Sequence, residues 1–185
     1  MIYILALAVL AAVAFALLYN QLIAKRQMTN NGWADIDVQL KRRADLVPQL
    51  VSVVQGYAAH ERQLFADIAE RRTQALAAAD DPARRGAAET ELSKPVARLI
   101  ALAESYPELK ASQNFLDLQK QLTDTENKIE MARRFYNGAV RELNTAVETF
   151  PSNLVAGVGG IQKRSFFEIS MSEGAVPQIK LGGAS

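Results

Sequence analysis

The chain contains no cysteine and a single histidine, His60, among its 185 residues. The missing thiols exclude disulfides, cysteine-bound zinc, iron–sulfur clusters and thiol catalysis. Lysine and arginine total 21 against 20 aspartates and glutamates, so the formal net charge is +1. Proteins that bind nucleic acid through surface charge carry a strong basic excess. We therefore expect no nucleic-acid partner.

Sequence motifs of common enzymes are missing as well. The chain has no Glu-x-x-His, H-E-x-x-H, G-x-S-x-G, Walker A or G-x-G-x-x-G pattern. A carboxylate metal-binding enzyme remains an alternative, and it would use Glu61, Glu126 and Glu130 with His60. Helical di-metal centres pair glutamate with histidine on two helices, which one histidine cannot supply. We therefore predict no catalytic residue, no metal and no cofactor.

A long apolar run opens the chain. The segment "MIYILALAVLAAVAFALLYNQLIA" (residues 1–24) carries no charged side chain. About 20 apolar residues are enough to span a bilayer core. A cleaved signal peptide is the alternative, but no lysine or arginine precedes the run and no A-x-A-like cleavage site ends it. Residues 1–24 are therefore predicted to be a retained transmembrane anchor.

The charges flanking this run predict its orientation. Lys25 and Arg26 follow it directly, and Lys41, Arg42 and Arg43 come next. The positive-inside rule then places the N-terminus outside and the main domain in the cytoplasm.

The rest of the chain shows helical periodicity. From about residue 29 to residue 79, apolar residues recur at spacings of three and four. Pro48 should bend or end a helix, and Gly56 is a second weak point, so one long bent helix and two shorter helices both stay open. Asp81 followed by Pro82 predicts the start of another helix, which runs to about Ser105.

The clearest pattern is a heptad seam in the second half. Its members fall at intervals of seven: Phe115, Leu122, Ile129, Tyr136, Leu143 and Phe150. They predict a helix of about 38 residues with a coiled-coil-like apolar edge, which Pro151 ends. No strand pattern precedes residue 160. The fold class is therefore all-α, with a bundle (residues 25–156) after the anchor and a flexible C-terminal tail (residues 157–185).

One cation lies on the apolar side of its helix. Arg43 falls between Ile36, Leu50 and Val54, so its guanidinium needs an acceptor from a neighbouring helix or a place at the bundle edge. The long C-terminal helix offers a polar line beside its seam, formed by Glu126, Glu130, Arg133, Asn137 and Asn144. We predict an inter-helix polar network of Arg43, Glu126, Glu130, Arg133 and Asn137. A lock that fixes helix register is favoured over a ligand site.

Several spaced segments together resemble one family. They are "WADIDVQLKRRADLVPQLV" (33–51), "GYAAHE" (56–61), "YPELKASQNFLDLQKQLTDTENKI" (106–129), "ARRFYN" (132–137), "FPSNLVA" (150–156) and "FFE" (166–168). Their sequence and order resemble the LemA family from residue 19 to residue 168. Gln49 stands where the family often has asparagine, and residues 74–96 match less distinctly.

The resemblance implies a bacterial membrane-anchored protein with a bromodomain-like, up-and-down four-helix bundle and no established activity. One relative takes part in magnetosome membrane biogenesis, and family genes near membrane metalloproteases suggest envelope maintenance. We therefore expect a single-pass inner-membrane protein with a non-catalytic structural or interaction role. Its expected partners are the membrane, a second copy of the chain, and a membrane protein such as a protease or envelope protein. An adaptor for a membrane protease is the alternative function.

Overall fold

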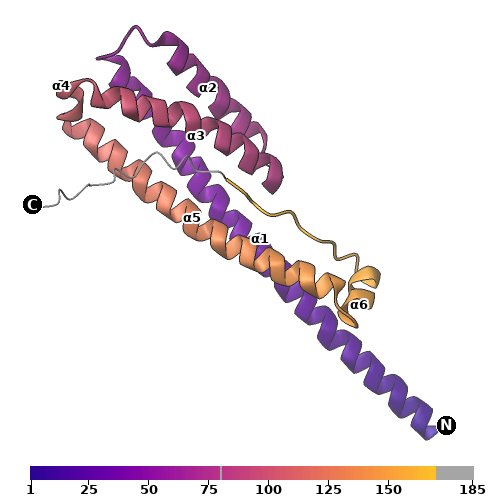
Figure 1. Cartoon of the computed structure of the whole chain (residues 1–185). Coiled ribbons are helices and arrows are strands. Elements are labelled where there is room, and N and C mark those ends of the chain that lie inside the picture. The colour runs from indigo at the N-terminus through magenta and orange to yellow at the C-terminus, as the bar shows by residue number, and fades with distance from the viewer. Residues whose placement is uncertain (80, 170–185) are drawn as a thin grey trace, which may run out of the picture. The chain divides into compact units, whose positions relative to one another are not determined.

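The computed structural model describes residues 1–79 and 81–169, and most of them are helical (Figure 1). In chain order the helices are α1 (Ile2–Gln55), α2 (Arg62–Ala77), α3 (Pro82–Glu104), α4 (Pro107–Lys110), α5 (Gln113–Glu148) and α6 (Ser152–Val158). No strand occurs in either described range. The predicted all-α fold is confirmed.

The chain divides into two compact units. Unit 1 comprises residues 1–41 and 125–167, and unit 2 comprises residues 42–124 and 168–185, of which the structure describes those up to 169 except residue 80. The helices α1 and α5 contribute to both units, whereas α2, α3 and α4 belong to unit 2 and α6 belongs to unit 1.

Unit 2 is a helical bundle around one apolar core. The last part of α1, the first part of α5 and the whole of α2 and α3 supply it, and α4 adds Leu109. Fully buried members include Val47, Leu50, Leu92 and Leu99. Apolar residues three and four apart lie on one helix face, so each helix turns a continuous stripe toward this core. The predicted helical bundle is thereby confirmed.

Helix α1 passes through Pro48 without ending. Proline has no backbone N–H, so Pro48 leaves the carbonyl of Ala44 without its helical hydrogen bond. The side chain of Arg72 on α2 replaces the missing donor, because its Nε donates to the Ala44 oxygen at 2.5 Å. An arginine from a neighbouring helix therefore supplies the hydrogen bond that the proline removes. The helix α1 continues past Pro48 and ends at Gln55, beside Gly56.

Unit 1 pairs α1 with α5 in antiparallel orientation. Lys25 Nζ lies 2.9 Å from Glu142 Oε2, and seven residues later along α1 Gly32 meets Phe135 and Tyr136 of α5. A Cβ at Gly32 would lie 3.1 Å from the Tyr136 Cα, so this glycine permits a close approach of the two helices. The hydrogen bond from Lys25 holds the pKa of the Glu142 carboxyl below its ordinary value.

Most of the heptad seam is buried as predicted. Phe115, Leu122, Ile129, Tyr136 and Leu143 are each at most 4% exposed. Phe150 was predicted to be on the seam, and this is wrong: it is 75% exposed. The reason is that α5 ends at Glu148, two residues before it.

The helix start at Asp81 is confirmed, since its side chain accepts from the Arg84 N–H.

The segment that follows α6 is packed onto the helices in part. Residues 161–169 form an extended strap without helix or strand, in which Ile161, Phe167 and Ile169 are buried. In unit 2 a Cβ at Gly86 of α3 would lie 2.2 Å from the Glu168 carbonyl oxygen, so glycine is required where the strap crosses α3. The remainder of the predicted tail, residues 170–185, lies outside the described residues.

We expect the Arg72→Met substitution to lower the free energy of unfolding by about 1.5 kcal/mol, because the Ala44 carbonyl loses a hydrogen bond from a charged group. In a Pro48→Ala background the loss should be much smaller, since residue 48 then regains an N–H for that carbonyl. Denaturant unfolding of the detergent-solubilised chain measures both. Arg71→Met is the matched control, because the Nε of Arg71 bonds Asp67 on its own helix. Equal losses with and without Pro48 would contradict the replacement of the missing donor by Arg72.

Candidate functional site

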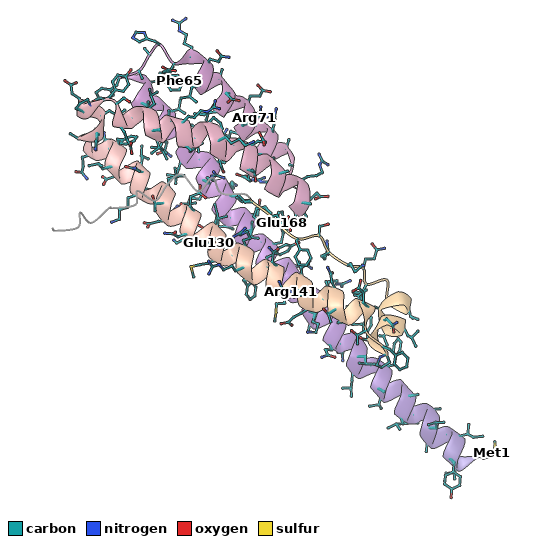
Figure 2. The ribbon with its side chains drawn as sticks, in the orientation of Figure 1. Met1, Phe65, Arg71, Glu130, Arg141 and Glu168 are labelled. Atoms are coloured by element: carbon teal, nitrogen blue, oxygen red, sulfur yellow. The ribbon has the colours of Figure 1, made fainter. Side chains whose placement is uncertain are left out.

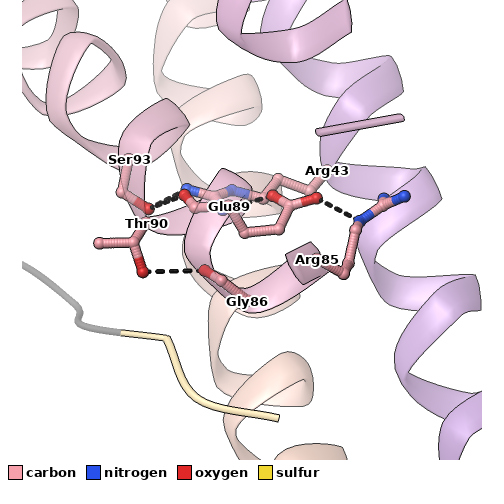
Figure 3. Close-up of polar contacts among 6 residues, drawn as sticks. All are labelled: Arg43, Arg85, Gly86, Glu89, Thr90 and Ser93. Atoms are coloured by element: carbon pink, nitrogen blue, oxygen red, sulfur yellow. Dashed lines mark hydrogen bonds and ion pairs between the residues drawn. The ribbon is translucent and has the colours of Figure 1, made fainter. Parts of the chain in front are cut away.

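Arg43 lies inside unit 2, where it bonds α3. Its side chain is 2% exposed. One nitrogen, Nη1, donates to Glu89 Oε2 at 2.9 Å, and Nη2 donates to the Ser93 hydroxyl oxygen at 2.8 Å (Figure 3). The acceptor from a neighbouring helix that the sequence required is therefore supplied by α3.

A second arginine binds the same carboxylate. Arg85 Nε donates to Glu89 Oε1 at 2.9 Å, so each oxygen of Glu89 accepts from a different arginine (Figure 3). Arg85 is 2% exposed and Glu89 is 1% exposed. Arg85, Glu89 and Ser93 are four residues apart in sequence, which lines them along one face of α3. Together with Arg43 they form what we call the buried charge cluster.

The energetics of such a cluster favour specificity over stability. Removing charges from water costs several kcal/mol per ion, and the mutual attraction offsets this cost only when the geometry is good. Breaking a buried pair by removing one partner costs about 3–5 kcal/mol, because the remaining charge is left uncompensated. Arg85 and Glu89 share α3, whereas Arg43 comes from α1, so the cluster selects the alignment of α1 against α3 in which Arg43 meets Glu89.

Unit 1 contains a different polar arrangement, which clamps the strap. Asn137 Nδ2 donates to the Phe167 carbonyl at 2.9 Å, and the Phe167 N–H donates to Asn137 Oδ1 at 3.0 Å. Asn144 repeats this pattern with Arg164, at 2.9 Å for each of the two bonds. The Tyr136 hydroxyl adds a bond to the Ser165 carbonyl at 2.8 Å. We call Asn137 and Asn144 the asparagine clamp.

The asparagine clamp fits because the distance between its two asparagines on α5 matches the distance between the two strap residues that they bond. Asn137 and Asn144 are seven residues apart on α5, a rise of about 10.5 Å at 1.5 Å per residue. Arg164 and Phe167 are three residues apart on an extended chain, a span of about 10 Å at about 3.4 Å per residue. Each side-chain amide can therefore pair with a backbone amide and carbonyl as a neighbouring strand would. On the strap, these bonds involve backbone groups only. The asparagine side chains therefore position the strap independently of its side chains.

The aromatic side chain of Trp33 packs against one side chain of the strap, Phe167. The Trp33 ring centroid lies 5.6 Å from that of Tyr136 and 5.6 Å from that of Phe167, with the latter pair edge to face. Phe167 is completely buried. Edge-to-face pairs are worth about 0.5–1.5 kcal/mol beyond the area that they bury. Backbone pairing by the clamp and burial of Phe167 therefore act on the same residue.

The other predicted network residues lie on α5 in unit 1. Glu130 forms an ion pair with Arg134 one turn along the helix, while Glu126 and Arg133 are half-buried. Asn137 belongs to the clamp. A single network that joins Arg43 to these four residues stays a prediction.

The structure assigns roles to residues that sequence reasoning missed. The sequence pattern did not single out Arg85, Glu89 or Ser93. Their spacing of four on α3 was the available signal, but exposed ion pairs show the same spacing. Asp67 and Arg71 of α2, for example, form a half-exposed pair at this spacing. Glu91 pairs with the exposed Lys94 at a spacing of three, and that hydrogen bond lowers the pKa of the Glu91 carboxyl.

The residues of the metal-binding alternative show no gathered site. His60 and Glu61 are exposed in the connection between α1 and α2. Within the described ranges, no group of three or more histidine, aspartate or glutamate side chains is placed to hold a metal ion. An open hollow of about 870 Å³ lies between α2 and α3, and Glu61, Asp67, Glu70 and Arg98 are among its lining residues.

Known proteins resemble this chain over most of its length. A sequence model described as the LemA family matches residues 32–181. Magnetosome protein MamQ 2 of Paramagnetospirillum magneticum is 22% identical over 188 residues, covering 88% of this chain and 69% of the relative. Magnetosome protein MamQ of Magnetospirillum gryphiswaldense is 21% identical over 192 residues, with 88% and 71% covered. Protein LemA of Metamycoplasma hominis is 23% identical over 154 residues, with 83% and 70% covered. The matched range includes both the buried charge cluster and the asparagine clamp.

Glu89→Ala is expected to lower the free energy of unfolding by about 3–5 kcal/mol, because it leaves two arginines buried without their shared acceptor. Glu91→Ala, two residues away and exposed, should change stability little. Denaturant unfolding followed by circular dichroism measures the difference. A triple replacement, Arg43→Met with Arg85→Met and Glu89→Leu, should recover much of the loss. Equal, small effects of the Glu89 and Glu91 variants would show that the cluster does not constrain the fold.

Asn137→Ala should speed backbone hydrogen exchange at Phe167, and Asn144→Ala should do so at Arg164. Each variant removes two hydrogen bonds, each worth about 0.5–1.5 kcal/mol. Exchange at Phe167 should therefore rise by roughly tenfold or more. Hydrogen exchange followed by mass spectrometry measures the effect, with Asn114→Ala, exposed near the start of α5, as the control. Unchanged protection in both clamp variants would refute the clamp.

Proposed function

Because the chain belongs to the LemA family, we propose that it is a single-pass protein of the bacterial inner membrane with a non-catalytic structural or interaction role. Its N-terminus would lie outside and the helices that follow the apolar run in the cytoplasm, as the basic residues after that run suggest. The magnetosome relatives are named for a membrane compartment, which supports a role at a membrane surface.

The observation that carries this proposal is the continuity of α1. The helix extends from Ile2 to Gln55 and includes an apolar stretch that is long enough to cross a membrane and entirely unburied. Side chains near Met1 project from α1 with no other element beside them (Figure 2). The same helix then supplies Ile36 and Leu40 to unit 1 and Val47 and Leu50 to unit 2, all completely buried. An apolar stretch that continues into the packed part of unit 1 as one helix suits a direct attachment of unit 1 to the membrane better than a flexible tether.

Unit 1 also offers an apolar surface for a partner. Met131 is 71% exposed and Phe135 is 50% exposed, one turn apart on α5. Phe135 contacts α1 at Gly32, and Met28, one turn before that glycine, is 46% exposed. Methionine adapts its shape to different partners and is common on interaction surfaces. We propose that these residues form a contact surface for a second copy of the chain or for another membrane protein.

Site-directed crosslinking in intact membranes tests this proposal. The absence of native cysteine means that Met131→Cys carries the sole thiol. We expect this variant to crosslink to one recurrent species with a thiol-reactive bifunctional reagent. Arg141→Cys, also exposed on α5, should not do so and serves as the matched control.

The identity of the captured species separates the two proposed roles. A dimer of the chain would support a self-assembling scaffold. A single foreign membrane protein would support an adaptor, such as one that serves a membrane protease. Recovery of Met131→Cys in the soluble fraction, or the same diffuse crosslinking from both positions, would refute the proposal.

A further inference from the structure

Three large apolar side chains at one end of unit 1 face solvent. Phe150 is 75% exposed, and Leu154 and Val158 of α6 are 62% and 80% exposed. Leu154 and Val158 are four residues apart in one short helix, so they lie on the same face. Phe150 precedes Leu154 by four residues. We call these three residues the α6 apolar edge.

The opposite face of α6 attaches it to the start of the folded part of α1. Val155 and Ala156 are buried in a cluster with Leu22, and half-buried Leu18 packs against this cluster. A Cβ at Gly159, just after α6, would lie 2.9 Å from Tyr19 Cε2. The helix α6 is therefore held beside residues 18–22 of α1.

This position coincides with the end of the apolar run. A hydrocarbon core of about 30 Å takes about 20 helical residues at 1.5 Å each. Residues 1–17 are all exposed, and Leu22 is the first fully buried residue of the chain. If residues 1–20 cross the bilayer, α6 lies where hydrocarbon gives way to lipid headgroups.

We propose that the α6 apolar edge inserts Phe150, Leu154 and Val158 into the boundary between headgroups and acyl chains of the adjoining leaflet. The partner is thus a lipid surface, and α6 is a second, interfacial contact beside the transmembrane span. Amphipathic helices of this kind bury their apolar face about 5–10 Å into that boundary. This inference rests on the proposed function, because it requires the apolar run to cross a bilayer.

The charges around α6 suit the same partner. Lys163 and Arg164 follow it, and Lys25 and Arg26 lie on the adjacent part of α1. Lys163 and Lys25 form exposed ion pairs with Glu148 and Glu142. Long basic side chains at this depth place their charges among lipid phosphates while their stems stay in apolar surroundings.

Spin labels on the full chain in vesicles test the proposal. The chain has no cysteine, so Leu154→Cys, Val158→Cys, Arg141→Cys and Leu10→Cys each give one labelled position. The vesicles contain phosphatidylethanolamine and phosphatidylglycerol. Electron paramagnetic resonance compares collisions with oxygen, which concentrates in the bilayer, and with a water-soluble nickel chelate. Arg141 is the control, because it is exposed on α5, lies outside the proposed contact surface of Met131 and Phe135, and is about 10 Å from the end of α5 at 1.5 Å per residue.

We expect labels at positions 154 and 158 to favour oxygen over the nickel chelate several-fold more than the label at 141 does. The label at position 10 should favour oxygen most. If position 10 is in lipid but positions 154 and 158 behave like 141, the interfacial contact is refuted while the anchor stands. If position 10 is also accessible to the nickel chelate, both the anchor and this inference fail. Dipolar broadening at 154 that disappears on dilution with unlabelled chain would show that a second copy covers the edge, and would also refute the lipid contact.

Discussion

The unbroken helix α1 is the constraint on which both units depend. A helix advances about 1.5 Å and turns about 100° per residue, so each residue of α1 has a set height and direction relative to its neighbours. The helix first presents a wholly exposed apolar stretch, then the face that packs on α5 in unit 1, and then the face that enters the core of unit 2. Pro48 could have interrupted it, and the bond from Arg72 to the Ala44 carbonyl compensates for the hydrogen bond that the proline removes.

Polar contacts in this protein favour one register of packing, whereas the apolar surfaces alone could pack in several registers. Leucine and valine stripes pack with little preference between neighbouring registers, because burial depends mainly on area. Glu89 pairs with Arg85 on its own helix and must also meet Arg43 of α1, and a shift of α1 by one turn would separate Arg43 from Glu89. On the strap, the packing of Phe167 against Trp33 selects the register, and the asparagine clamp then bonds backbone groups three residues apart.

Two groups of exposed apolar residues on unit 1, outside the apolar run, differ in their surroundings. Met131 and Phe135 lie in the middle of the α1–α5 pair, where a protein partner could reach them. Phe150, Leu154 and Val158 lie beside residues 18–22, at the end of the apolar run. The proposed roles follow from this difference: the first surface suits another protein, and the second suits lipid. A span with a nearby interfacial contact would limit how far unit 1 can tilt from the membrane surface.

Local pattern was enough to predict much of this protein. Apolar periodicity identified the helical class and the buried seam from Phe115 to Leu143, and Asp81 with Pro82 marked a helix start. These features depend on neighbours within one or two turns. The seam prediction went wrong at Phe150, where the chain leaves the helix although its spacing continues the heptad.

The partners of the polar residues depended on contacts between segments far apart in the chain. Arg43 was singled out because its position on the helix wheel was apolar, yet nothing in its neighbours pointed to Glu89, which is 46 residues away. The role of Asn137 likewise needed the strap to return 30 residues later. Helical periodicity shows which face of a helix is buried because that depends on local geometry. It cannot show which distant group the face meets, because packing between helices determines that.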